Sequence, residues 1–174
     1  RPMIDRPDDD TSELVPHILA CDVGNSAIKF AHVHGDVVGE VQTMRLGDLG
    51  QLGPALARLW HDLPAPRKIV AASVNAVGLK ALEAAAAEHL DGQEVLVIGR
   101  DIGRPIDTAL PEPDAIGVDR LCAAVAAFDR LGVACVVADF GTAITIDAVN
   151  DEGVFLGGAI LPGLRMGAQS LHEK

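Results

Sequence analysis

Two short segments of the sequence carry the same combination of residues, and that combination could bind phosphate. Asp22–Ser26 has the sequence Asp-Val-Gly-Asn-Ser, and Asp139–Ala143 has the sequence Asp-Phe-Gly-Thr-Ala. In each, an apolar run ends in an aspartate, a glycine follows two residues on, and a hydroxyl or amide side chain comes next. One Asp-x-Gly is an ordinary turn. Two in matching positions indicate two like halves that face one nucleotide.

The first segment offers both hydrogen-bond donors for phosphate and a carboxylate. A Gly24 backbone can approach phosphate oxygens without a Cβ clash, and Asn25 and Ser26 add side-chain donors. Asp22 could hold a hydrated cation or orient the transferring group. Lys29 could bring a point positive charge to the phosphates, or it is an ordinary strand lysine on a solvated face.

The second segment offers the same kinds of binding group from the other half of the chain. Gly141 and Thr142 could approach the phosphates, and the carboxylate of Asp139 could provide oxygens for a cation. Thr145 either joins them or is only a strand residue.

A third segment, Gly117–Arg120, lies at the start of an expected helix. An acidic residue in a first helical turn favours the helix dipole, which is a sufficient structural reason for Asp119. Phosphoryl transfer also needs a group that accepts the proton of the acceptor hydroxyl, and Asp119 could be that general base. The Arg120 guanidinium could anchor an anion, because its fork matches a carboxylate.

The charge balance restricts the partners. With 25 acidic and 14 basic side chains the formal net charge is −11, so the attraction that brings proteins to a phosphate backbone is missing and nucleic acid is not an expected partner. ATP would need focused donors instead, such as backbone N–H groups, a lysine or a cation.

Cysteine and hydropathy patterns point to a cytoplasmic protein. The three cysteines, Cys21, Cys122 and Cys135, sit in apolar runs without zinc-site spacing, so each is predicted to be a small core residue. No run reaches the ~18 apolar residues of a membrane span, and the N-terminus resembles neither a signal peptide nor a transit peptide.

Periodicity predicts an α/β chain in which the two Asp-Gly segments each end a strand. Residues 1–14, acidic and poor in apolar side chains, are predicted to be a disordered tail. The expected strands are His17–Val23, an alternating run up to Thr43, Lys68–Ala72, Glu94–Ile98, Val133–Ala138 as a buried strand, and two strands within Thr142–Ile160 joined by a turn at Asn150–Gly153. The expected helices are Pro54–Leu63, Gly78–Leu90, Gly117–Leu131 and a last one from Pro162.

Four segments in this order resemble the type III pantothenate kinases: Asp22–Ser26 with Lys29, Gly117–Arg120, Asp139–Thr145, and Gly157–Leu164. The similarity extends from about His17 to Lys174. It implies an RNase-H-like, actin-like ATPase fold. A complete N-terminal lobe would span residues 15–136, and a partial C-terminal lobe residues 137–174.

The resemblance also implies an activity, the ATP-dependent phosphorylation of pantothenate to 4′-phosphopantothenate on the route to coenzyme A. Members use Mg-ATP, need potassium or ammonium, and form homodimers. Carried over, Gly117 and Val118 bind substrate, Asp119 is the proton acceptor and Arg120 anchors the pantothenate carboxylate. Asp139 would be the ligand of the monovalent cation and Thr142 an ATP contact, and the Gly157–Leu164 segment would lie beside the acyl substrate.

Two departures from the family pattern leave alternatives open. Leu110–Pro113 stands where the family carries an aromatic residue near pantothenate, and the chain stops at Lys174 inside the expected last helix. A second lobe without all its helices is expected to expose apolar surface and to favour poor monomeric behaviour or a dimer partner. The alternatives are a non-catalytic accessory protein of kinase fold, or a kinase of the same superfamily with another small acceptor.

Overall fold

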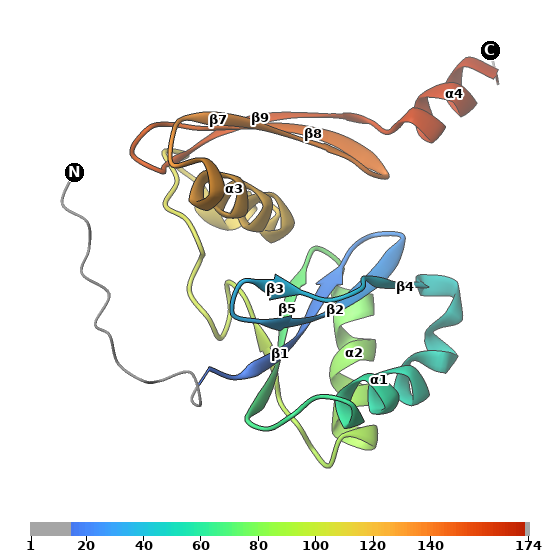
Figure 1. Cartoon of the computed structure of the whole chain (residues 1–174). Coiled ribbons are helices and arrows are strands. Elements are labelled where there is room, and N and C mark those ends of the chain that lie inside the picture. Colours follow the sequence, from blue (N-terminus) through green and yellow to red (C-terminus); the bar gives the residue numbers. More distant parts are fainter. Residues whose placement is uncertain (1–14, 173–174) are drawn as a thin grey trace.

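The computed structural model describes residues 15–172. The expected acidic tail, residues 1–14, and residues 173–174 lie outside the described residues. The described chain builds two sheets with one long helix between them (Figure 1). Each sheet has a hydrophobic cluster of its own.

The first sheet contains an antiparallel hairpin next to parallel strands. Its order is β3-β2-β1-β5-β6, with β4 also paired to β2. β1 is antiparallel to β2 and parallel to β5, and β5 is parallel to β6. The strand bounds are β1 His17–Val23, β2 Ala27–His34, β3 Val37–Val38, β4 Gln42–Arg45, β5 Arg67–Ser73 and β6 Val95–Val97. The predicted strands of this half are confirmed.

Helix α1 (Leu52–His61) precedes β5, helix α2 (Ala76–His89) connects the parallel strands β5 and β6, and both helices cover one face of the first sheet (Figure 1). A short 3-10 helix, η1 (Leu46–Gln51), leads into α1. The Asn75 side chain begins α2 by accepting a hydrogen bond from the Gly78 N–H at 2.8 Å, which satisfies one of the free donors of the first turn. Both predicted helices are confirmed to within about two residues at each end.

The second sheet is an antiparallel meander, β7-β8-β9. Its strands are β7 Cys135–Phe140, β8 Ala143–Val149 and β9 Phe155–Pro162. The predicted turn at Asn150–Gly153 is present, because the Asn150 side chain accepts hydrogen bonds from two N–H groups of the turn and Gly153 takes a positive φ of 79°. Helix α4 (Leu164–His172) follows and extends past the end of the sheet (Figure 1).

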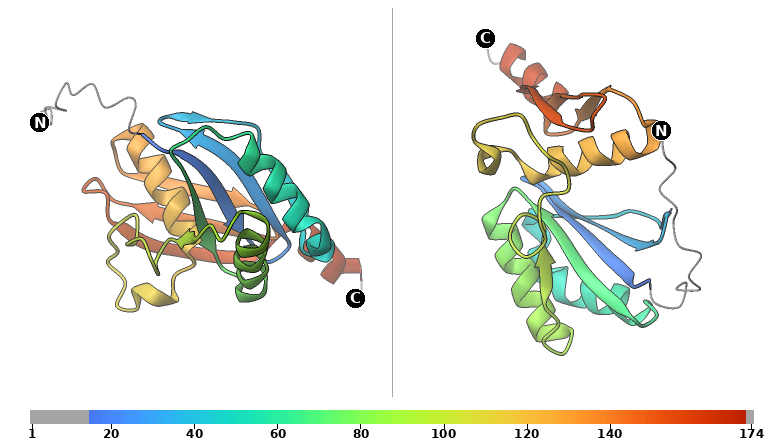
Figure 2. Two further views of the ribbon diagram at one scale, coloured as in Figure 1. Left: turned by 90° about the horizontal axis from the view of Figure 1, so that it is seen from below. Right: turned by 90° about the vertical axis from the view of Figure 1, so that its left-hand side faces the viewer.

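Helix α3 (Val118–Leu131) lies between the two sheets, as the right-hand view of Figure 2 shows. A 3-10 turn, η2 (Pro113–Ala115), precedes it. Its buried residues Leu121 and Ala124 belong to the second hydrophobic cluster, together with Phe155. The division of the chain into lobes at residue 137 stays a prediction, and α3 precedes that boundary while it packs on the second core.

The outer face of the second sheet corrects one prediction. The apolar run Val133–Ala138 was expected to be a buried strand, but β7 is mostly exposed and Val136 is 69% exposed. Phe140 and Ile160 are exposed as well. The reason is that α3 covers a single face of this sheet, and the other face is open (Figure 1). The expected exposed apolar surface is therefore present. None of the helices within residues 15–172 is long and apolar enough to cross a membrane.

Candidate active site

The two Asp-Gly turns each close with a hydrogen bond from the glycine N–H, across three residues in the first turn and two in the second, and they touch each other. Gly24 N–H donates to the Ala27 carbonyl at 3.0 Å, and Gly141 N–H donates to the Ala143 carbonyl at 3.0 Å. The hydroxyl oxygens of Ser26 and Thr142 are 2.8 Å apart, within hydrogen-bond distance. The turns that the sequence singled out at positions 116 residues apart therefore meet at one place.

A cavity of about 530 Å³ lies at this meeting point, and we call it the turn cavity. It brings together the predicted ATP-binding residues, the predicted base and the predicted cation ligand: Asp22, Gly24, Asn25, Ser26, Lys29, Asp119, Asp139, Gly141 and Thr142. Thr145, left open in the sequence, also lines it. The remaining lining residues, which the sequence did not indicate, are Ala27, Ala72, Val74, Cys122, Ala123 and Ala143. Most of these are small, and small side chains leave room for a ligand.

Asp22 and Lys29 are opposite each other on β1 and β2 and form an ion pair at 3.1 Å. Their side chains are 43% and 54% exposed. An exposed pair of this kind is worth about 0–1 kcal/mol. Little free energy would therefore be lost if either side chain left this pair to bind a ligand.

Asp119 lies in the first turn of α3, where its Oδ1 accepts the N–H of Arg120 at 2.8 Å. Gly117 leaves room for this position of the carboxylate, because a Cβ at residue 117 would come within 2.6 Å of the same oxygen and displace it. This contact fixes the carboxylate at the edge of the turn cavity, near the positive end of the helix dipole.

Arg120 does not join these residues. Its guanidinium binds both carboxylate oxygens of Asp147 on β8, with Nε 3.1 Å from each, and the two side chains are only 14% and 3% exposed. Its Cζ also lies 5.6 Å from the centre of the Phe155 ring. Breaking a buried pair by removing one partner costs about 3–5 kcal/mol. Arg120 is thus held in the second core, and its assignment as a carboxylate anchor stays a prediction.

A second cavity, of about 370 Å³, lies at the other side of the α3 N-terminus, and we call it the helix-start cavity. The predicted substrate residues Gly117 and Val118 line it, and Val74 lines both cavities. Two arginines that the sequence did not indicate, Arg100 and Arg104, line it as well. A lone arginine in a loop of mixed charge has no sequence signal that marks it as a binding residue.

Cys122 lines the turn cavity, which corrects the prediction that it is a core residue. Burial, and then the charges of Asp119 and Asp22, raise the pKa of its thiol to about 11. The thiol therefore stays neutral at neutral pH and is no nucleophile. Cys21 is a core residue as predicted, and burial raises its thiol pKa to about 12. Cys135 is half-buried and packs against the second cluster.

The donor set of the turn cavity suits a cation that arrives with a nucleotide. Asp22, Asp119 and Asp139 all line this cavity. Among residues 15–172, no three histidine, cysteine or acidic side chains are grouped closely enough to cage a metal. Mg²⁺ keeps several waters and is usually bound by one or two carboxylates together with substrate phosphates. The residues present therefore fit Mg²⁺ bound to a triphosphate.

Gly163 packs closely against the backbone of the second Asp-Gly turn. Its N–H donates to the Thr142 carbonyl at 3.1 Å. A Cβ at this position would come within 2.2 Å of that same oxygen. A glycine is therefore needed where β9 passes the turn, and the sequence had placed this residue only in the segment expected beside the acyl substrate.

Comparison with solved structures shows the fold. A crystal structure of the Aquifex aeolicus Ppx/GppA phosphatase, type II variant, superposes with a TM-score of 0.53 at 14% identity, over 90% of this chain and 55% of that chain. Another structure of the Aquifex aeolicus Ppx/GppA family member gives 0.50 at 14% identity, over 92% and 54%. The expected actin-like ATPase fold is therefore confirmed.

Sequence comparison then gives the family. The family model of the type III pantothenate kinase matches residues 18–174. A type III pantothenate kinase of Syntrophotalea carbinolica is 33% identical over 172 residues, and one of Moorella thermoacetica is 32% identical over 164 residues. Each match covers 90% of this chain and 64% of the relative. The chain belongs to the type III pantothenate kinase family, and it spans just under two thirds of the length of these relatives.

Proposed function

We propose that this protein transfers the γ-phosphoryl group of ATP to the 4′-hydroxyl of pantothenate, giving ADP and 4′-phosphopantothenate, a step towards coenzyme A. One observation carries the proposal: like turns from two sheets and three carboxylates surround a single cavity. Asp119 lines this cavity, and the two residues before it, Gly117 and Val118, line a second cavity, where an acceptor has room. Membership of the family supports the same reaction.

In this proposal the turn cavity holds the triphosphate. Gly24 and Gly141 allow close backbone approach, while Asn25, Ser26 and Thr142 donate to phosphate oxygens. The hydrogen bond between the Ser26 and Thr142 hydroxyls gives way as each turns to a phosphate. Lys29 leaves Asp22 for a phosphate oxygen. Asp22 would hold hydrated Mg²⁺, which would neutralise charge on the phosphates.

Asp119 acts on the acceptor. The acceptor hydroxyl oxygen forms a bond to the γ-phosphorus, and the bond from that phosphorus to the β,γ-bridging oxygen breaks, so that ADP leaves with the electron pair. The hydroxyl proton passes to the free Oδ2 of Asp119, since Oδ1 already accepts the Arg120 N–H. The contact that orients this carboxylate is therefore made by its own helix.

Further features of the family belong to the same proposal. Asp139 is the protein ligand for potassium or ammonium, and the protein is a homodimer. With a net charge of −11 it has no nucleic-acid partner. It works in the cytoplasm with no membrane partner.

The decisive experiment is Asp119→Asn in the full-length protein, assayed by ADP release with pantothenate, ATP and potassium. We expect kcat to fall by about 10²–10⁴-fold, the usual contribution of a general base. Folding should be unchanged, because the asparagine oxygen can still accept the Arg120 N–H. Asp129→Asn is the matched control, an exposed aspartate on the same helix, and it should keep the wild-type rate.

Wild-type turnover in Asp119→Asn would contradict its role as base. If the unmodified protein does not turn over with pantothenate but does with another small hydroxy acid or sugar, the acceptor is wrong and the kinase stands. If no acceptor is phosphorylated, only the accessory role remains. Leu110–Pro113 stands where the family carries an aromatic residue near pantothenate, and this difference is the reason to test other acceptors.

A further inference from the structure

The end of β5 lies beside the first Asp-Gly turn, at the same edge of the first sheet. β1 and β5 are parallel and pair Val23 with Ser73, so the residues after both strands leave the sheet together. The Val74 N–H donates to the Val23 carbonyl at 3.1 Å, which continues this pairing past the ends of the strands. Asn75 therefore follows β5 where Asn25 follows β1, and the two side chains meet although they are 50 residues apart.

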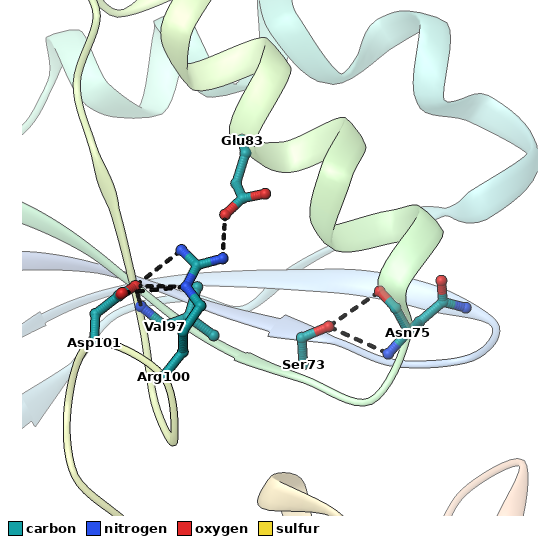
Figure 3. Close-up of polar contacts among 6 residues, drawn as sticks. All are labelled: Ser73, Asn75, Glu83, Val97, Arg100 and Asp101. Carbon is teal, nitrogen blue, oxygen red and sulfur yellow. Dashed lines mark hydrogen bonds and ion pairs between the residues drawn. The ribbon is translucent and has the colours of Figure 1, made fainter.

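The backbone of Asn75 is held in place by its neighbours. The Ser73 hydroxyl donates to the Asn75 carbonyl at 3.1 Å and accepts the Asn75 N–H at 3.2 Å, as Figure 3 shows. The first turn of α2 packs closely on β1, because a Cβ on Gly78 would come within 2.8 Å of the Val23 side chain. The Asn75 side chain therefore extends from a fixed backbone towards Asn25.

The amide of Asn75 has one orientation, because its oxygen is already used. Asn75 Oδ1 accepts the Gly78 N–H at 2.8 Å as the cap of α2. Its Nδ2 is then the atom that faces Asn25, and it donates to Asn25 Oδ1 at 3.4 Å. An amide carries its acceptor and its donors on opposite arms, so this contact leaves the Asn25 Nδ2 for another partner. Asn25 lines the turn cavity, and in the proposed function that partner is a phosphate oxygen.

Capping alone does not account for an asparagine at position 75. Serine, aspartate and asparagine cap helices about equally well. Of these, only asparagine also carries N–H donors on the group that supplies the capping oxygen. An exposed contact of 3.4 Å adds little stability. Its consequence is orientation, because it favours one of the two ways in which the Asn25 amide can turn.

We infer that Asn75 is a positioning residue for ATP, and that it turns the Asn25 amide so that Nδ2 donates to the triphosphate. The inference rests on the proposed function. Asn75 itself lines neither the turn cavity nor the helix-start cavity, so it acts through Asn25 and not by touching the ligand. The first turn of α2 thereby sets the direction of a hydrogen-bond donor at the end of β1.

The test measures ATP binding with Mg²⁺ by calorimetric titration of the full-length protein, and folding by urea denaturation. Asn75→Asp keeps the capping oxygen, so the urea midpoint should not fall. The same change replaces the donor to Asn25 by an acceptor, which reverses the Asn25 amide and presents its oxygen to the phosphates. We expect the Kd for ATP to rise by about tenfold or more, the scale of a hydrogen bond to a charged group. The KM for pantothenate should stay unchanged.

A matched control and a neutral variant accompany it. Asn150→Asp adds the same charge at an asparagine whose oxygen also accepts backbone N–H groups, at the end of β8 away from the turn cavity, and should keep the wild-type Kd. Asn75→Ser still caps α2 but is too short to reach Asn25, whose amide is then free to turn either way. Its Kd should rise by only about two- to fivefold.

The decisive measurement repeats these changes in Asn25→Ala, where the donor to phosphate is already lost. There, Asn75→Asp and Asn75→Ser should weaken ATP binding no further. If Asn75→Asp weakens binding equally in both backgrounds, its carboxylate repels the phosphates directly and the positioning role is refuted. Wild-type affinity in Asn75→Asp refutes that role and leaves the proposed function intact, and so does an equal loss in Asn150→Asp. An unmodified protein that does not bind ATP refutes both.

Discussion

The two sheets present the same Asp-x-Gly turn to one cavity, yet they are supported very differently. Within the described residues, the cluster behind the first sheet has 17 buried hydrophobic residues and the cluster behind the second has 5. On β1, alternate residues Leu19, Cys21 and Val23 are buried, whereas β9 is exposed from Gly158 onwards. Helices α1 and α2 cover the first sheet, while α3 alone covers the second (Figure 1).

The difference shows that an Asp-x-Gly turn forms at the cavity with either a large or a small core behind it. Each turn closes with a glycine N–H that donates to a carbonyl at 3.0 Å, three residues on in the first turn and two residues on in the second. What differs is the role of the ion pair in each half. In the first sheet, Asp22 and Lys29 form an exposed pair at the cavity. In the second, Arg120 and Asp147 form a buried pair that joins α3 to β8.

The largest expected effect tests this contrast of ion pairs. Asp147→Ala should lower the free energy of unfolding by about 3–5 kcal/mol, because it leaves the Arg120 charge buried without a partner. Lys29→Met, in the exposed pair, should change it by about 1 kcal/mol or less. Urea denaturation of both variants measures the difference. Equal effects would show that the two pairs are not structurally distinct.

Truncation of a leucine in each half is expected to have the next largest effect. Leu82 is fully buried in the first cluster, and Leu82→Ala should cost about 2–5 kcal/mol of unfolding free energy. Leu156 lies on the open face of β9, and Leu156→Ala should stay within about 0.5 kcal/mol. A large loss for Leu156→Ala would mean that this face is covered in solution, by a dimer partner for instance. The same denaturation experiment, repeated at several protein concentrations, would detect that.

The local features of the site could be predicted from the sequence, because turn chemistry acts over a few residues. Asp22–Ser26 and Asp139–Ala143 were placed at strand ends from glycine, hydroxyl and apolar patterns alone, and the structure brings them together at the turn cavity. The helix start at Gly117 followed from the same kind of local signal.

Long-range partners could not be predicted. Nothing near Arg120 in the sequence indicates that Asp147, 27 residues away, would bind its guanidinium. The apolar run Val133–Ala138 shows what could be buried, but whether a helix covers the strand depends on the assembled fold.

The smallest expected effect is a pH dependence confined to the first sheet, since the strands of the second carry no histidine. His17 lies 2.8 Å from a ring nitrogen of His32 and stacks on His34 with ring centres 4.0 Å apart. Partial burial, and then the charges of His34 and His32, lower the His17 pKa below its ordinary value of 6.5.

Because the folded state binds this proton less well than the unfolded state, its contribution to stability is present above the ordinary pKa and is lost as the pH falls. The urea midpoint should therefore fall between about pH 7.5 and about pH 5.5, a range that brackets the ordinary histidine pKa. His17→Gln should reduce this fall, whereas His61→Gln, at an exposed histidine on α1, should not. An unchanged fall in His17→Gln would show that the three stacked histidines are not its source.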